Sequence, residues 1–243
     1  MSNPWILLWL EGPLQAWGFD SRFYRRETLN FPTRSGILGL LCCALGASGP
    51  QQALLEEFAL LRQTVLSFGR VRRNGDSGTE DSEILLRDFH MVGSGYKERD
   101  PWESLLIPKT KDGKKAVGGG TKITNRFYLQ DAAFSVSMEV PGKMLNEIET
   151  ALQNPVWDLY LGRKCCVPTD FIYRGYFSSE SGAIDKAQEI AKEKSRAEKF
   201  RVTEDEHYLD EPSEALRLND VPIQFGEEKR YRDRQVGQVL KLL

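Results

Sequence analysis

The chain has 243 residues, of which 40% are hydrophobic and 28% charged, and its formal net charge at pH 7 is −2. This composition suits a folded protein of one large domain or one and a half, and it excludes a globally basic nucleic-acid-binding protein. No apolar run approaches the ~20 residues that span a membrane, and the N-terminus lacks the basic region of a signal peptide.

The first half of the chain predicts a strand, two helices and two further strands. Trp5 to Leu10 is an apolar run typical of a strand buried on both faces, and residues 19–31 form an aromatic and arginine-rich loop or edge strand. The run from Ile37 to Leu45 predicts a buried helix, and PQQALLEEFALLRQ predicts a second one. The segments TVLSFGRVRR and SEILLRDFHMV predict strands separated by a turn-rich stretch.

The second half predicts a long insertion, a strand, a helix and a strand. The stretch from Gly93 to about Arg126 is irregular, rich in glycine and lysine, and too long for a routine connection. The segment AAFSVSMEV alternates apolar and polar residues as a half-buried strand does, and PGKMLNEIETALQN follows it as a helix. The segment DFIYRGYF predicts another strand.

This order of elements predicts an α+β fold, a ferredoxin-like or RRM-like βαββαβ domain over residues 1–178 with an insertion at about 92–127. In such a domain the helices cover one face of an antiparallel sheet, and we expect the other face to be free. Residues 179–243 form a small C-terminal extension with a charged helix at 180–201, an acidic loop at 203–214 and a basic segment that ends in a short strand.

The four cysteines form two adjacent pairs, Cys42-Cys43 and Cys165-Cys166. Adjacent pairs fit neither a secreted disulfide framework nor the C-x₂-C spacing of zinc sites. We therefore expect reduced thiols, no structural metal and a cytoplasmic location.

No complete catalytic set is visible, and no motif for a cofactor or metal is present. Of the two histidines, His90 follows Asp88 by two residues and could act as general base on a ribose 2′-OH, or it is a strand residue at a sheet edge. His207 lies in the acidic loop and is expected at the surface. Gly118 to Gly120 could cradle phosphates or form a flexible loop tip.

Basic residues cluster with aromatic ones in a pattern typical of single-stranded nucleic-acid binding. Arginines suit phosphate and aromatic faces suit unstacked bases, although an amphipathic edge strand would have the same composition. In the N-terminal cluster, the arginines Arg22, Arg25 and Arg26 alternate with Phe19, Phe23 and Tyr24.

The segment PTRSG begins the helix at residues 37–45 and could also receive an anion. Pro32 or Thr33 can start the helix, whose first N–H groups lack partners within it. Ser35 offers a hydroxyl, Gly36 would let a phosphate approach, and Arg34 could fork onto phosphate oxygens. The alternative is an ordinary helix cap.

Together, LEGPLQAWG, FPTRSGILGLL, LRDFH and YLGRKCCVP resemble the "Cas-five" subunit family of type I-E CRISPR Cascade complexes, in the RAMP superfamily. The resemblance runs from Trp5 to about Phe177, with a weaker echo in KRYRDRQV. It implies a ferredoxin-like RAMP domain with a long inserted thumb. It also implies a non-catalytic subunit for antiviral defense that grips the 5′ handle of the CRISPR RNA and caps the backbone-subunit filament. Its other partners would be the large PAM-reading subunit and target DNA, without a membrane.

The resemblance also implies RNA contacts. The helix-start motif faces the RNA handle, an arginine in NRFY contacts it, the lysines of 109–122 lie in the thumb, and the YLGR turn carries a basic pair. With the N-terminal arginine cluster, the expected RNA-binding residues are Arg22, Arg25, Arg26, Arg34, Ser35, Lys109, Lys122, Arg126, Arg163 and Lys164.

Two alternatives remain open from the sequence. One is a metal-independent endoribonuclease that processes CRISPR RNA precursors, as in type I-C relatives, with His90 and either Tyr24 or Lys122. The other is a plain RRM-like RNA-binding module.

Overall fold

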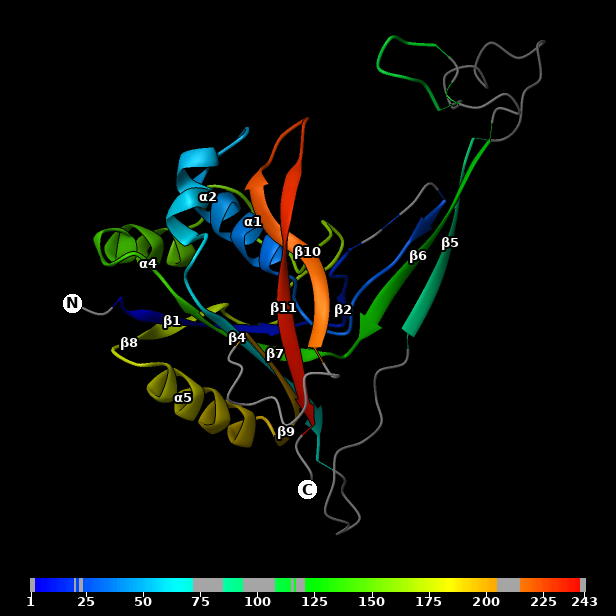
Figure 1. Ribbon diagram of the computed structural model, residues 1–243. Helices are drawn as coiled ribbons and strands as arrows, with labels where there is room; N and C mark the ends of the chain where they lie inside the picture. The colour runs from blue at the N-terminus through cyan, green and yellow to red at the C-terminus, as the bar shows by residue number, and fades with distance from the viewer. Residues whose placement is uncertain are drawn as a thin grey trace.

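The computed structural model describes residues 3–19, 21, 24–71, 85–93, 108–114, 116, 121–204 and 215–240. Two sheets organise it: a seven-stranded sheet in the order β10-β11-β9-β4-β7-β1-β8, and a smaller sheet in the order β2-β6-β3 with β5 beside β6 (Figure 1). The elements are β1 Trp5–Glu11, β2 Leu14–Gln15, β3 Arg25–Arg26, α1 Arg34–Leu45, α2 Gln52–Phe58, β4 Gln63–Arg70, β5 Leu85–Val92, β6 Lys122–Gln130, β7 Ala133–Glu139, the 3₁₀ turn η1 Gly142–Met144, α4 Leu145–Gln153, β8 Tyr173–Phe177, α5 Glu180–Glu193, β9 Arg196–Thr203, β10 Ala215–Gln224 and β11 Arg230–Leu240.

The large sheet is antiparallel at every described pairing, with β1 between β7 and β8. Successive side chains of a strand point to opposite faces, so the continuous apolar run of β1 supplies two cores at once. Ile6, Leu8 and Leu10 join the core under α1 and α4. Trp5, Leu7 and Trp9 join a second core on the opposite face. The predicted strand buried on both faces is confirmed.

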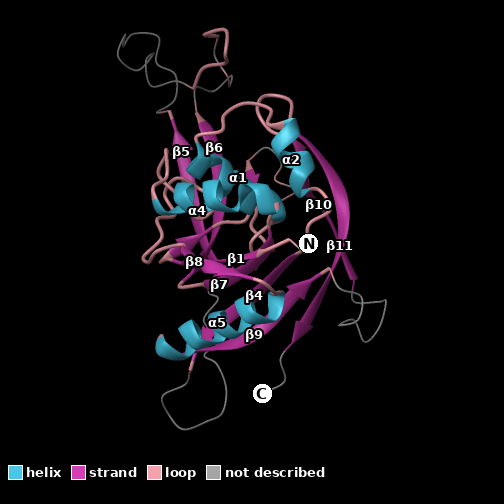
Figure 2. Ribbon diagram, turned by 90° about the vertical axis from the view of Figure 1, so that its left-hand side faces the viewer, coloured by secondary structure: helices cyan, strands magenta, loops and turns pink. Residues whose placement is uncertain are grey.

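The expectation that one sheet face is free is wrong. α1 and α4 lie on one face and α5 on the other (Figure 2). Among the charged residues of α5 there is a narrow stripe of apolar residues at positions i, i+4, i+7 and i+8. Because these positions lie on one side of a helix, the stripe can pack on the sheet. Its members are Ala183, Ala187, Ile190 and Ala191. Bases therefore cannot stack on this part of the sheet as they do on the open sheet of an RRM.

The C-terminal segment extends the large sheet. β9 pairs with β4, and β11 pairs with β9. The hairpin of β10 and β11 forms the edge and curves over α1 and α2 (Figure 1). The sequence predicts only a short final strand, whereas Arg230–Leu240 is one long strand. Cross-strand pairing explains the difference, since charges such as Arg217 on β10 and Asp233 on β11 neutralise each other at 2.7 Å.

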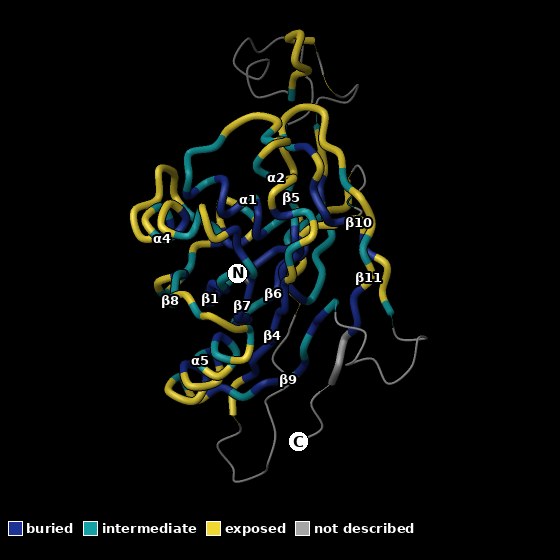
Figure 3. The backbone as a smooth tube through the Cα atoms, turned by 60° about the vertical axis from the view of Figure 1, so that its left-hand side comes forward, coloured by how far each residue is buried: buried dark blue, intermediate teal, exposed yellow. Residues whose placement is uncertain are grey.

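β5 and β6 form an arm that projects from the large sheet; β5 is mostly exposed, whereas β6 is exposed at its outer end and buried from Phe127 to Leu129 (Figures 1 and 3). The expected irregular stretch ends earlier than predicted, because Lys122–Gln130 is strand paired with the whole of β5. Within the part of the chain that is described, residues 108–114 form a turn, with Thr110 N–H donating to the Lys114 carbonyl at 2.7 Å. The glycines at 118–120 lie outside the described residues.

A buried network of two arginines and two carboxylates joins α1 to the C-terminal strands. Arg34 donates from Nη1 to Glu204 at 2.8 Å, and Arg234 donates from Nη1 to the same carboxylate at 2.6 Å. Asp220, which is 3% exposed, accepts from Arg234 Nε at 2.7 Å and from the Arg34 backbone N–H at 2.7 Å. Burial disfavours both guanidinium charges and lowers the pKa of Arg34, whereas the hydrogen bonds and charges of Asp220 and Glu204 outweigh burial and raise the pKa of Arg234.

The expected phosphate contact of Arg34 is therefore wrong. Its side chain is 2% exposed, and Nη2 also donates to the carbonyls of Phe58, at 2.7 Å, and Leu61. The guanidinium points into the protein, where its hydrogen bonds to these two carbonyls hold the C-terminal end of α2 against α1.

The cysteines are free thiols. Burial raises the pKa of Cys42 to about 11 and that of Cys166 to about 12. Both groups are protonated at neutral pH, so they act as small packing side chains. No helix in the described part of the chain is long and apolar enough to cross a membrane.

Replacing Arg34 with alanine should lower the free energy of unfolding by about 3–5 kcal/mol, because it removes one member of a buried ionic network and the donor to the Phe58 and Leu61 carbonyls. Urea unfolding of the full chain measures this. The control is Lys143→Ala, which removes an exposed cation at 2.6 Å from Glu57 and should cost at most about 1 kcal/mol. Equal losses for the two variants would show that the network is not stabilising.

Candidate nucleic-acid interface

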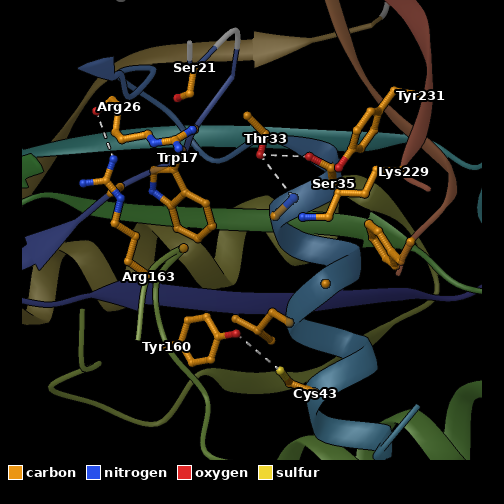
Figure 4. Close-up of a pocket in the computed structure, with 17 residues that line it drawn as sticks. Trp17, Ser21, Arg26, Thr33, Ser35, Cys43, Tyr160, Arg163, Lys229 and Tyr231 are labelled. Atoms are coloured by element: carbon orange, nitrogen blue, oxygen red, sulfur yellow. Dashed lines mark hydrogen bonds between the residues drawn. The ribbon is translucent and has the colours of Figure 1, made fainter. Parts of the chain in front are cut away.

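A hollow of ≈ 390 Å³ opens beside the first half of α1. Four other segments complete its wall: residues 16–18 with Ser21, β3, the turn at 160–163, and the connection from β10 to β11 with the start of β11 (Figure 4). Its 17 lining residues, all in the described part of the chain, include three cations and no aspartate or glutamate. The cations are Arg26, Arg163 and Lys229. We call this hollow the α1 pocket.

The start of α1 is capped by the protein itself. Thr33 is the N-cap, and its Oγ1 accepts from the Gly36 N–H at 3.1 Å. The Asp220 carboxylate accepts from the Arg34 N–H, so it already provides the negative charge that a helix N-terminus favours. Of the PTRSG motif, Thr33, Ser35 and Gly36 line the pocket, while the Arg34 side chain points into the protein.

Trp17 forms a rigid wall of the pocket. Its Nε1 donates to Gln15 at 3.1 Å, and Gln15 Nε2 donates to the Leu10 and Ala132 carbonyls at 3.0 and 2.8 Å. A Cβ at position 36 would lie 2.8 Å from the Trp17 ring. Gly36 therefore makes room for this ring, which replaces the expected approach of a phosphate as the reason for the glycine.

Gly39 lies one turn later on α1 and lines the pocket too. A Cβ there would meet no atom within 4 Å. It therefore leaves one wall of the pocket flat, close to the helix backbone, and a larger side chain at this position would project into the open space.

Arg163 connects the pocket to the arm. Its Nη2 donates to the Arg26 carbonyl at 3.0 Å (Figure 4). Its Nη1 donates to the Phe127 carbonyl at 3.2 Å, and the guanidinium lies 4.7 Å from the centre of the Tyr128 ring. The preceding Gly162 has φ +88, and a Cβ there would lie 1.8 Å from the Ala16 carbonyl oxygen. Only glycine fits, so the turn is held against residue 16 and the arginine against β6.

Two tyrosines add hydrogen-bonding groups. Burial raises the pKa of Tyr160, and the neighbouring Cys43 raises it further; burial also raises the pKa of Tyr231. Both phenols are therefore protonated at neutral pH and can donate to an anion or a base. Sequence reasoning missed both tyrosines, Trp17, Gly39 and Lys229. For Lys229 and Tyr231 the only signal is the weak KRYRDRQV echo.

One face of the arm is mainly polar and the other mainly apolar, although exposed Val92 lies on the first and exposed Arg87 on the second. The register places Asp88 opposite Arg126 and His90 opposite Thr124, with Lys122 two residues further along the same face. His90 Nε2 contacts the Asp88 carboxylate. Arg126 is also the partner of Arg26 across the parallel pairing of β3 and β6, so the polar face continues to the α1 pocket.

The opposite face of the arm exposes large apolar side chains. Phe89 is 56% exposed and Met91 63% exposed. By the same register, Leu85 and Ile123 belong to this face, and both are exposed. A two-stranded ribbon with such a face is typical of a segment that packs on another molecule.

The remaining predicted residues lie outside the pocket or outside the described residues. Arg25 is exposed, pairs with Glu27 and lies 5.0 Å from the centre of the Phe127 ring. Lys109 is exposed beside the turn at 110–114, and Lys164 is exposed next to Arg163. Arg22 and His207 fall outside the described residues.

Comparison with known proteins gives consistent matches. The family model described as CRISPR-associated protein (Cas_Cas5) matches residues 5–237. The CRISPR system Cascade subunit CasD of Escherichia coli (strain K12) is 33% identical over 181 residues, which cover 70% of each chain. A chain of a solved CRISPR RNA-guided surveillance complex is 27% identical with a TM-score of 0.68, over 97% of this chain and 89% of that one. A solved Cas protein is 26% identical with a TM-score of 0.60, over 98% and 94%.

The two glycines of α1 should respond in opposite directions to alanine. Gly36→Ala should destabilise the fold, because the new Cβ overlaps the Trp17 ring. Gly39→Ala should stabilise it by roughly 0.5–1 kcal/mol, because alanine is the better helix former and the space is open. Paired urea titrations measure both changes. A loss of stability in Gly39→Ala would contradict the open wall.

Proposed function

The chain belongs to the Cas5 family of CRISPR-associated proteins, and from this membership we propose that it is the CRISPR RNA-binding subunit of a type I-E Cascade surveillance complex. In this role it grips the 5′ handle of the RNA in the α1 pocket. It caps the filament of backbone subunits in a cytoplasmic complex for antiviral DNA targeting.

The observation that carries the proposal is the charge of the α1 pocket. Three cations converge on a hollow whose described lining contains no carboxylate, so the pocket favours an anion. RNA is the polyanion that also uses the aromatic and hydroxyl groups beside these cations, because it presents phosphates, 2′-hydroxyls and bases. The flat wall at Gly39 lets a ribose or phosphate approach the helix backbone.

The polar face of the arm supports a path for the RNA beyond the pocket. Arg26 in the pocket, Arg126 on β6 and Lys122 further out follow one another along this face. These cations can track successive phosphates of a single strand. In this proposal Arg126 and Arg163, and not Arg34, contact the RNA phosphates.

The fold supports a finer assignment to the ferredoxin-like RAMP domain. The elements β1, α1 with α2, β4, β7, α4 and β8 run in the expected βαββαβ order, and their strands lie in the spatial order β8-β1-β7-β4. In this assignment the arm of β5 and β6 is the thumb. The segment after residue 178 is the C-terminal extension, which adds α5 and three strands to the same core.

The apolar face of the arm supports assembly with protein partners. Its exposed Phe89, Met91 and Ile123 would be costly in a chain that works alone. We assign this face to neighbouring subunits, with the backbone RAMP subunits and the large PAM-reading subunit as the partners. Target DNA joins in the assembled complex.

One observation favours a second candidate function. The Asp88 carboxylate holds His90 on the same face as Arg126 and Lys122, an arrangement with a general base and phosphate-binding cations. This supports the metal-independent endoribonuclease alternative. We prefer the non-catalytic role, because Asp88 and His90 are not among the residues that line the α1 pocket, in which the proposal places the 5′ handle.

Replacing pocket cations should weaken RNA binding and flatten its salt dependence. For Arg26→Ala or Lys229→Ala, the log–log slope of affinity against salt should fall by about 0.7, the value for one lost single-strand phosphate contact. Fluorescence anisotropy with labelled repeat RNA across a salt series measures this.

The matched control for these variants is Lys186→Ala, which removes an exposed cation from α5, on the opposite side of the large sheet (Figure 2). It should bind RNA like the wild type. Equal slopes in all four proteins would mean that the pocket does not hold the RNA backbone.

The full chain should leave repeat RNA intact, with and without a divalent metal. Gel analysis of labelled RNA after incubation tests this. A specific product that appears with the wild type and disappears with His90→Ala would establish the endoribonuclease alternative.

A further inference from the structure

A second hollow, of ≈ 620 Å³, adjoins the α1 pocket. Cys43 and Tyr160 line both, so one wall is common to the two. The other lining residues are Val156, Trp157, Asp158 and Lys164. We call it the Trp157 hollow.

The backbone of Trp157 is held firmly, and its side chain is partly exposed. Its N–H donates to the Cys43 carbonyl at 3.3 Å, and the Val156 N–H donates to the Ala44 carbonyl at 3.0 Å. The Val156 side chain packs against Gly46, where a Cβ would lie 2.8 Å from Val156 Cγ1. The loop is therefore fixed to the last turn of α1, while the tryptophan side chain is 45% exposed.

The charged side chains beside Trp157 suit a nucleotide better than an apolar side chain of another protein. Lys164 and Asp158 are exposed, and within the described residues neither makes an ion pair. Lys164 can hold a phosphate, and the Asp158 carboxylate can accept from the amino or imino groups of a base. A tryptophan face between these groups is a stacking surface of the kind that binds unpaired bases.

We propose that the Trp157 hollow is a second nucleotide subsite, which takes the residue of the RNA strand next to the one in the α1 pocket. The inference rests on the proposed function, because it needs RNA in the α1 pocket. The base stacks on Trp157, its edge faces Asp158, and its phosphate lies near Lys164. Tyr160, in the common wall, separates the two subsites.

Asp158 also sets a base preference. A carboxylate only accepts hydrogen bonds, so it favours bases whose edge offers donors. Guanine presents two parallel donors, its imino and amino N–H groups, and fits the two oxygens of one carboxylate. The subsite therefore favours guanine over uracil, which presents a single imino donor.

Fluorescence anisotropy with labelled single-stranded RNA and the full-length chain tests the subsite. Trp157→Ala should weaken binding about five- to one-hundred-and-fifty-fold, the range for one lost stacked base, with an unchanged salt slope. Trp157→Phe should restore most of the affinity. Lys164→Ala should lower the slope by about 0.7, and Asp158→Asn should reduce the preference for guanine-containing RNA over uracil-only RNA. The matched control is Phe171→Ala, which removes a side chain that is 83% exposed and lines neither hollow.

Failure of this inference is distinguishable from failure of the proposed function. If Trp157→Ala binds like the wild type while Lys229→Ala loses affinity, the second subsite is wrong and the proposed function stands. If wild type and Lys229→Ala bind RNA equally, the proposed function fails and the subsite with it. If Trp157→Ala keeps its RNA affinity but no longer enters the multisubunit complex, the hollow holds a protein side chain, which also overturns the inference.

Discussion

The buried network of Arg34, Glu204, Asp220 and Arg234 determines where a ligand can bind this protein. Asp220 occupies the N-terminus of α1, so the positive end of that helix is already neutralised by a residue of β10. An incoming phosphate cannot use the helix start. The open surface instead lies along the side of α1, where Gly39 leaves the helix backbone uncovered.

The same network brings the C-terminal hairpin over α1. Asp220 and Arg234 belong to β10 and β11, and the connection between these strands carries Lys229. The network therefore holds in place both α1, which forms one wall of the α1 pocket, and the two strands whose connection supplies Lys229. Stability and binding are coupled here, since loss of the network would also displace Lys229 and Tyr231.

Local sequence patterns predicted the elements near the start of the chain but not the long-range partners. The apolar run of β1 and the Thr33 cap of α1 are readable from adjacent residues. The burial of Arg34 is not, because its carboxylate partner is Glu204, 170 positions later. The same limit hid the packing of α5: a charged helix was predicted at 180–201, but it ends at Glu193, Arg196–Thr203 is strand, and the apolar stripe that packs on the sheet is outnumbered by charges. In the α1 pocket, Ser35 and the cations Arg26 and Arg163 were foreseen, while Lys229 depends on a hairpin that no local pattern places over α1.

A second group of ion pairs holds the base of the arm, at the end of the central strands opposite to the Arg34 network. Arg196 contacts Glu11 on β1 at 2.8 Å and Asp131, in the turn between β6 and β7, at 3.1 Å. A hydrogen bond from Arg70 lowers the pKa of Asp131. Burial alone would raise the pKa of Glu11, but hydrogen bonds from Trp9, Lys194 and Arg196 outweigh burial and lower this pKa. Carboxylates with lowered pKa stabilise the fold above their unfolded pKa of about 4 and lose this effect only as the pH falls through the folded value. At neutral pH the base of the arm is therefore fixed, so its polar face keeps its register with the α1 pocket while its apolar face stays exposed.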